Sequence, residues 1–179
     1  MRRLLIGGLV IAVLAWAAWR WTLAPREAVV TEDAKPDSSG TGLKVVRLYF
    51  AAPSGDSLVG ESRDLVELHG LHERVAALVG ELDRGPAGGG IAALPAGTSV
   101  LHVYLDDRGL MTLDLSRAFR QGFRGGSTAE YLAIASLVRT IGANLPETNR
   151  VLLVCGGAPL PTLGGHLPLD RPLEVSELR

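Results

Sequence analysis

The chain has 179 residues, of which 47% are hydrophobic and 21% are charged, and its formal net charge is -1. From residue 44 onward it carries thirteen Lys or Arg and fifteen Asp or Glu residues, with the two signs interspersed. A basic stripe that could follow a phosphate backbone is missing, which excludes nucleic acid as a partner. Cys155 is the only cysteine, so an internal disulfide is excluded and the fold must rest on its core.

An apolar stretch from Leu4 to Trp19 follows two arginines near the N-terminus. Continued as a helix through residue 24, it measures about 31 Å, enough to cross the hydrocarbon core of a bilayer. All three tryptophans lie at its distal end, as in an interfacial aromatic belt, and the positive-inside rule keeps the N-terminus cytoplasmic. We therefore predict a transmembrane anchor at residues 1–24, with the remainder outside the cytoplasm. The alternative is a signal peptide cleaved at Ala15-Trp16-Ala17, which would give a secreted or periplasmic product.

Residues 25–43 are polar and rich in Pro, Ser, Gly, Thr and acidic side chains. This composition is typical of a flexible linker. About eighteen such residues extend over at most about 60 Å, so the domain that follows must find its partners near the membrane. Residues 44–179 suffice for one domain with a substantial core and are too few for two.

The first elements expected in this domain are two strands and a helix. Residues 45–50 are dense in β-branched and aromatic types and stop at Pro53-Ser54-Gly55, which predicts a strand and a turn. Residues 58–65 are expected to form a second strand. Gly88-Gly89-Gly90 lacks the Lys-Ser/Thr of a phosphate loop and is expected to be a flexible crossover. Before it, apolar residues at three- and four-residue steps predict a helix that ends at Gly85-Pro86: Leu68, Leu71, Val75, Leu78, Val79 and Leu82.

The second half continues with a hairpin, a helix and a strand. Residues 98–105 and 110–115 alternate between apolar and polar types around a Gly-containing loop, which predicts a β-hairpin. Ser127 and Glu130 have the spacing of a capping box, so a helix should start there and run to Leu145. Residues 150–155 form a buried strand, and a short strand is expected near 173–175. The predicted fold is α+β, a single domain of mixed β-sheet packed by two helices, in the order β(β)αββαβ.

Several segments share their order and spacing with a known family. They are Leu48-Tyr49-Phe50, residues 58–63, Gly85-Pro86, residues 94–98, Leu113 to Ser116 with Phe119, Gly126-Ser127 with Glu130, residues 151–156, and Pro172-Leu173. In these residues the chain resembles the GerM-type, or GerMN, domain of sporulation and spore-germination proteins. The resemblance implies an extracytoplasmic, non-catalytic module, similar to ring-building domains of envelope machines. The chain departs from the best-known spore member, which resembles a tandem of two domains behind a lipoprotein signal.

No catalytic, cofactor-binding or metal site is predicted. Asp114 and Ser116 lie on no Gly-x-Ser-x-Gly elbow, so we expect them to bond backbone amides in a turn. His69, His72 and Glu73 have spacings that suit metal ligands, but the helix is not secure at His69 and no third protein ligand is evident.

Three further residue types are interpreted structurally. Cys155 is expected to be a small buried side chain, which His102 and His166 approach only if the tertiary fold brings them there. The adjacent carboxylates Asp106 and Asp107 point apart and are expected to form the hairpin turn.

Residues 119–126 contain two aromatics and two arginines, the types enriched at binding hot spots. Phe119 fits the family pattern and is expected in the core, whereas Arg120, Phe123 and Arg124 are predicted to form part of a partner-binding surface. The leading hypothesis is a membrane-anchored module that binds envelope proteins or itself, in sporulation, germination or cell-wall remodelling. The alternatives are a peptidoglycan-binding or cell-wall-active protein with an unrecognised site, and a scaffold that polymerises through an exposed sheet edge.

Overall fold

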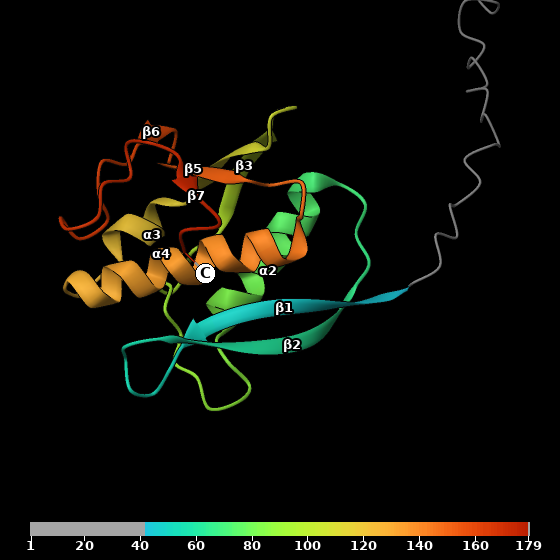
Figure 1. Cartoon of the computed structure of the whole chain (residues 1–179), viewed down its shortest axis with the longest axis horizontal. Helices are drawn as coiled ribbons and strands as arrows, with labels where there is room; N and C mark the ends of the chain where they lie inside the picture. The colour runs from blue at the N-terminus through green and yellow to red at the C-terminus, as the bar shows by residue number, and fades with distance from the viewer. Residues whose placement is uncertain (1–41, 179) are drawn as a thin grey trace, which may run out of the picture. The chain divides into compact units, whose positions relative to one another are not determined.

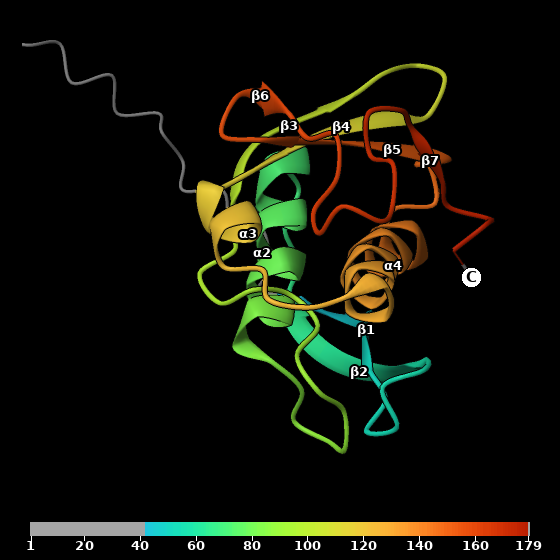
Figure 2. The same cartoon turned by 90° about the vertical axis from the view of Figure 1, so that its left-hand side faces the viewer.

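Two separate β-sheets lie on either side of a pair of helices in the computed structural model, which describes residues 42–178 (Figures 1 and 2). The predicted α+β class and the core order β(β)αββαβ are confirmed. The transmembrane helix predicted at residues 1–24, and the linker up to residue 41, lie outside the described residues. None of the helices between residues 42 and 178 is long and apolar enough to span a bilayer.

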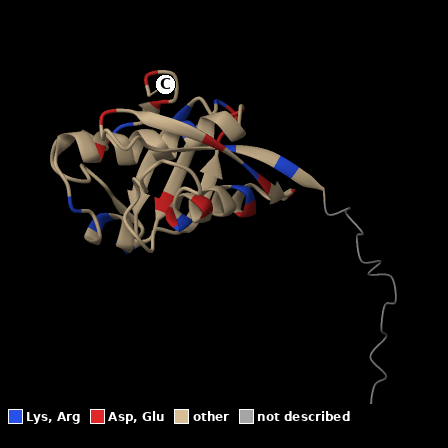
Figure 3. Ribbon diagram, turned by 90° about the horizontal axis from the view of Figure 1, so that it is seen from below, with Lys and Arg blue, Asp and Glu red and all other residues tan. Residues whose placement is uncertain are grey.

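The first sheet is a two-stranded antiparallel hairpin of β1 (Leu43–Ala51) and β2 (Leu58–Val66). Both strands were predicted, and β1 begins one residue before the expected domain boundary. Val46, Leu48 and Phe50 alternate along β1 and are buried, because successive strand residues point to opposite faces. The two strands carry basic and acidic residues along their length (Figure 3).

The predicted first helix is α2 (Leu71–Arg84), which buries four apolar residues of the recognised pattern: Val75, Leu78, Val79 and Leu82. Leu68 lies before the helix. Gly85 ends it with φ at +87°, a backbone conformation that glycine adopts without steric cost. The stop signal at Gly85-Pro86 is therefore confirmed.

The second sheet runs in the order β3-β4-β5-β6. The predicted hairpin consists of β3 (Val100–Leu105) and β4 (Leu110–Leu115), and β5 (Arg150–Cys155) lies parallel to β4. The short strands β6 (Ala158–Pro159) and β7 (Leu173–Glu174) both pair with β5. The inner face of this sheet is apolar and fully buried at Met111, Leu113, Leu115, Val151 and Leu153.

The crossover from β4 to β5 contains α3 (Arg117–Gln121) and α4 (Ser127–Asn144). The predicted capping box is wrong. Gly126 is the residue that precedes the helix, with extended geometry, and no side chain caps the helix start. The carboxylate of Glu130 instead accepts hydrogen bonds from the C-terminal loop, which was too distant in the sequence to be included in a local capping pattern.

The expected single mixed sheet is also wrong, because polar side chains of α4 occupy the edge of β1. Arg47 N–H donates to Asn144 Oδ1 (2.9 Å), and Asn144 Nδ2 donates to the Arg47 carbonyl (2.7 Å). Tyr49 N–H donates to Thr140 Oγ1 (3.1 Å), and Ser136 Oγ donates to the Tyr49 carbonyl (2.5 Å). Since these three α4 residues are spaced four apart, they share one helix face and replace a neighbouring strand.

Candidate partner-binding groove

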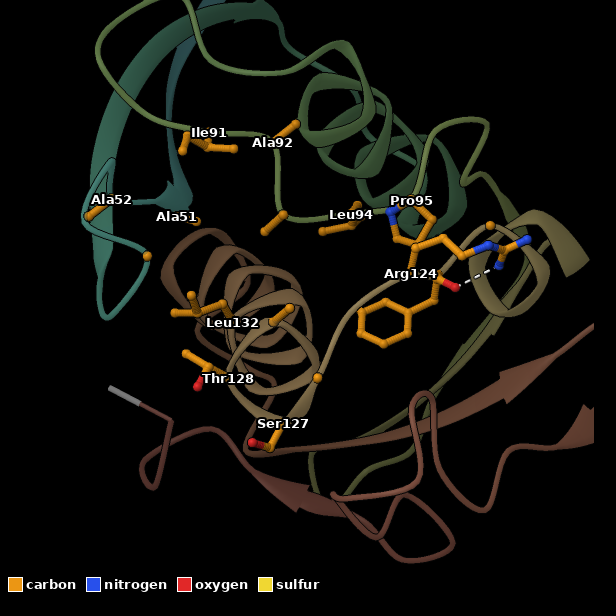
Figure 4. A pocket seen from close by; sticks show the side chains of 16 residues that line it. Ala51, Ala52, Ile91, Ala92, Leu94, Pro95, Arg124, Ser127, Thr128 and Leu132 are labelled. Carbon is orange, nitrogen blue, oxygen red and sulfur yellow. Dashed lines mark hydrogen bonds between the residues drawn. The ribbon is translucent and has the colours of Figure 1, made fainter.

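A groove of about 630 Å³ opens where β1 ends and α4 begins (Figure 4). One wall is the segment 91–95 beside the end of β1, and the other is the first turn of α4 with the loop before it. The lining is mostly apolar and small, and its labelled members include Ala51, Ile91, Ala92, Pro95 and Leu132. The groove is therefore the candidate binding site of the domain.

The wall formed by residues 91–95 offers free backbone groups. Ile91 exchanges two hydrogen bonds with Ala51, at 3.0 and 2.8 Å, in a single antiparallel bridge. Beyond this bridge, no backbone hydrogen bond between residues 42 and 178 uses Ala92 or Ala93. Ile91 is 52% exposed. An extended peptide could therefore continue the pairing along this wall.

The opposite end of the groove is formed by the amino terminus of α4 and by Arg124. Because Gly126 provides no capping side chain, the first amides of α4, at Ser127 and Thr128, lack a side-chain acceptor, and both residues line the groove. The helix dipole places partial positive charge there. Arg124 lies at the margin of the groove, and its guanidinium extends toward α3, where Nη1 donates to the carbonyls of Gln121 and Phe123, both at 2.7 Å (Figure 4). These groups would favour a carboxylate on the bound segment.

Glu130 fixes the loop that lies behind Phe123. Its carboxylate is fully buried and accepts hydrogen bonds from the amides of Leu163 (3.0 Å), Gly164 (2.8 Å) and His166 (2.8 Å), and His166 Nδ1 lies 3.0 Å away. Although burial acts to raise the pKa of Glu130, these hydrogen bonds lower it to about 2. A Cβ at Gly164 would lie 2.6 Å from the Phe123 ring, so the clamped loop packs directly on this aromatic side chain.

The structure brings together two of the three residues predicted to bind a partner. Phe123 and Arg124 line the groove, although Phe123 is half-buried and packs on the core. Arg120 lies elsewhere, beside a smaller hollow of about 260 Å³ next to Cys155. Arg120 therefore does not line the groove that Phe123 and Arg124 share, and the role of the three residues in partner binding stays a prediction. The sequence analysis missed Ile91, although an apolar residue between a glycine run and Pro95 was an available signal.

The residues interpreted as turn formers do bond backbone groups. Gly157 N–H donates to both oxygens of Asp114 at 3.1 Å. Ser116 Oγ accepts from the Ser99 amide (3.1 Å) and donates to the Gly97 carbonyl (3.1 Å). The predicted role of Asp114 and Ser116 is confirmed.

The remaining candidates are dispersed. Asp106 Oδ1 accepts the amides of Arg108 (2.9 Å) and Leu110 (2.8 Å) and so forms the predicted hairpin turn. His102 faces Asp114 and His166 faces Glu130, so neither histidine pairs with the buried Cys155 thiol, which contacts the Ser116 carbonyl. His69, His72 and Glu73 are exposed near the start of α2. In the described part of the chain, no three His, Cys, Asp or Glu residues are arranged to hold a metal ion.

The structure is an α+β domain with an apolar groove beside the start of α4. The family model Germane, described as sporulation and spore germination, matches residues 47–161, and the chain belongs to this family. The resemblance to GerM-type domains is thereby confirmed. Comparison with curated proteins gives no match.

Solved structures share the fold. The tandem GerMN domains of the sporulation protein GerM from Bacillus subtilis match with a TM-score of 0.62 at 19% identity, over 76% of this chain and 48% of that chain. The first GerMN domain of the same protein matches with a TM-score of 0.60 at 21% identity, over 73% of this chain and 97% of that chain. A protein of Clostridium perfringens, described as a candidate lipoprotein, matches with a TM-score of 0.54 at 19% identity, over 76% of this chain and 90% of that chain.

Proposed function

We propose that the chain is a non-catalytic protein-binding module of the cell envelope, which holds an extended, acidic segment of a partner protein in the groove at the start of α4. The observation that carries this proposal is the combination, in one groove, of an apolar wall with free backbone groups and the uncapped amino terminus of α4 beside Arg124. The wall would supply main-chain hydrogen bonds, and the amino terminus of α4 would select a carboxylate.

The envelope setting is supported by the apolar N-terminal stretch and by the family. Residues 1–24 would anchor the chain with the domain outside the cytoplasm, and the linker would keep the domain near the membrane. Two fold neighbours are GerMN domains of a sporulation protein, and a third is described as a candidate lipoprotein. Sporulation or spore germination is therefore the process that we propose for this chain.

The proposal can be tested by selecting ligands for the groove. The full-length protein is presented in nanodiscs to a library of random decapeptides, and the selected peptides are sequenced and their affinities measured. We expect peptides that combine apolar residues with Asp or Glu. Ala92→Trp, which would fill the groove, should weaken binding about tenfold or more, whereas Ala87→Trp on a neighbouring exposed loop should not. If the selected peptides bound the Ala92→Trp and Ala87→Trp proteins with equal affinity, the proposal would be contradicted.

A further inference from the structure

The hairpin of β1 and β2 has two edges, and only the edge of β1 has its backbone groups hydrogen-bonded, to side chains of α4. In an antiparallel pair, residues opposite each other direct their backbone groups both toward the partner strand or both away from it. The backbone groups of Arg47 and Tyr49 point at α4. Ser62 and Gly60 lie opposite these two residues, so their backbone groups point away from β1. No hydrogen bond between residues 42 and 178 uses the backbone groups of Gly60, Ser62 or Asp64 on this side.

This free edge is accessible. Figure 1 shows β2 on the side of β1 away from α4, and the loop after α2 lies next to the strand, where the Ala87 and Gly88 amides donate to the Glu61 carboxylate. Gly60, Ser62, Asp64 and Val66 are all exposed. The strand is nine residues long and contains neither the Pro nor the Lys that commonly protect an open edge from pairing. Such an edge is suited to accept another strand.

The sequence of β2, LVGESRDLV, is complementary to itself when read in the opposite direction. With Ser62 opposite the same residue of a second copy, Glu61 faces Arg63. In the same register Gly60 faces Asp64, and the apolar residues of the two ends face one another. A shift by one pair in either direction would place Glu61 opposite Glu61 or Arg63 opposite Arg63, which like-charge repulsion disfavours.

We propose that two copies of the chain pair through β2, antiparallel and in the register centred on Ser62, to give a four-stranded sheet in the order β1-β2-β2-β1. The pairing is two-fold symmetric and therefore closes as a dimer. Within each copy Arg63 Nε already bonds Glu61 Oε1 at 2.7 Å, so the dimer would set two such ion pairs side by side with opposite charges facing. This contact is separate from the groove and adds self-association to the proposed function.

Disulfide trapping tests the register. The full-length protein, with Cys155→Ser to remove the native thiol, is oxidised in membranes and run on non-reducing gels. Ser62→Cys should form a covalent dimer. Gly60→Cys and Asp64→Cys should each cross-link poorly alone, since identical residues there would be about 13 Å apart, but should cross-link together when the two are co-expressed. Ser54→Cys, in the exposed turn, is the control.

A proline substitution tests the hydrogen bonds. Ser62→Pro removes an N–H that the single copy does not use, and the residue before it is already extended, so the domain should stay folded by circular dichroism. We expect loss of the dimer in sedimentation of the full-length protein in detergent, with Ser62→Ala unchanged. A wild-type protein that is monomeric at all concentrations, or cross-linking of Ser62→Cys no stronger than that of Ser54→Cys, would overturn the proposal.

Peptide binding in the groove and dimerisation through β2 can be tested independently of each other. A Ser62→Pro protein that loses the dimer should still bind the selected peptides, because the groove lies at the turn end of the hairpin, beside Ala51 and α4, whereas Ser62 lies midway along β2. The Ala92→Trp protein should conversely still dimerise.

Discussion

Glu130 illustrates how a carboxylate can stay ionised without any exposed surface. Burial alone would favour its protonated form, but three backbone amides and the His166 imidazole surround it and hold the charge. These bonds join the first turn of α4 to a loop more than thirty residues later in the chain. A single side chain therefore fixes the position of the loop that packs against Phe123.

Replacing this carboxylate should destabilise the domain. Glu130→Gln leaves one oxygen for three amide donors and introduces an NH₂ group beside them, so the free energy of unfolding should fall by about 3 kcal/mol. Urea denaturation monitored by circular dichroism measures this. The control is Glu147→Gln, whose half-exposed ion pair with Arg74 should contribute less than about 1 kcal/mol. Equal effects of the two substitutions would contradict the role given to Glu130.

The same residue predicts a pH dependence. The pKa of Glu130 is about 2 in the folded protein and 4.5 as its ordinary value. Because the folded pKa is the lower one, its contribution to stability is complete above the ordinary value and is lost as the pH falls toward about 2. The stability difference between the wild type and Glu130→Gln should therefore narrow between pH 5 and pH 2. A difference that stays constant over this range would exclude the mechanism.

At the scale of elements, the contact between α4 and β1 organises the first sheet. Ser136, Thr140 and Asn144 provide the donors and acceptors that a third strand would otherwise supply. This arrangement protects one edge of the hairpin from pairing with other chains. It also ends the sheet at two strands.

Removing the Thr140 hydroxyl should lower the stability of the contact between α4 and β1. Thr140→Val keeps the shape but leaves the Tyr49 amide without an acceptor, which should cost about 1 to 3 kcal/mol of stability. Hydrogen exchange read by NMR should show the Tyr49 amide losing protection more than its neighbours. Thr128→Val, on the exposed first turn of the same helix, is the control and should leave Tyr49 protection unchanged.

Local patterns predicted the longer strands and helices because each depends on short-range periodicity, whereas the short α3 and β6 were not predicted. The apolar steps of α2 and the stop at Gly85-Pro86 are examples. The number of sheets was not predictable, since it depends on polar α4 side chains that meet β1 about ninety residues away in sequence. The capping box failed for the same reason, because the partners of Glu130 come from residues 163–166.

The candidate site was predictable only in part. Residue type identified Phe123 and Arg124 in one loop, and both line the groove. Composition cannot say that α3 directs Arg120 to a different surface, nor that Ile91 crosses to the end of β1. Those placements are set by the tertiary fold.

At the scale of the whole molecule, the domain offers a groove and an open strand edge on one scaffold. If the groove selects acidic segments by charge, Arg124→Glu should weaken binding of the selected peptides about fivefold or more. Arg120→Glu changes the charge equally but lies outside the groove, so its effect should be small. Binding is measured by fluorescence anisotropy at two salt concentrations. Equal losses for both variants would indicate a diffuse electrostatic effect and would contradict a defined site.

The most direct test of partner binding is photo-crosslinking in living cells. A photoreactive amino acid is placed at Ala92 of the full-length protein, with Ala87 as the matched position outside the groove. Mass spectrometry then identifies what is attached at each position. We expect acidic, extended peptides of specific envelope proteins at Ala92 and not at Ala87. Attachment of peptidoglycan fragments at Ala92, or the same products at both positions, would contradict a protein-binding groove.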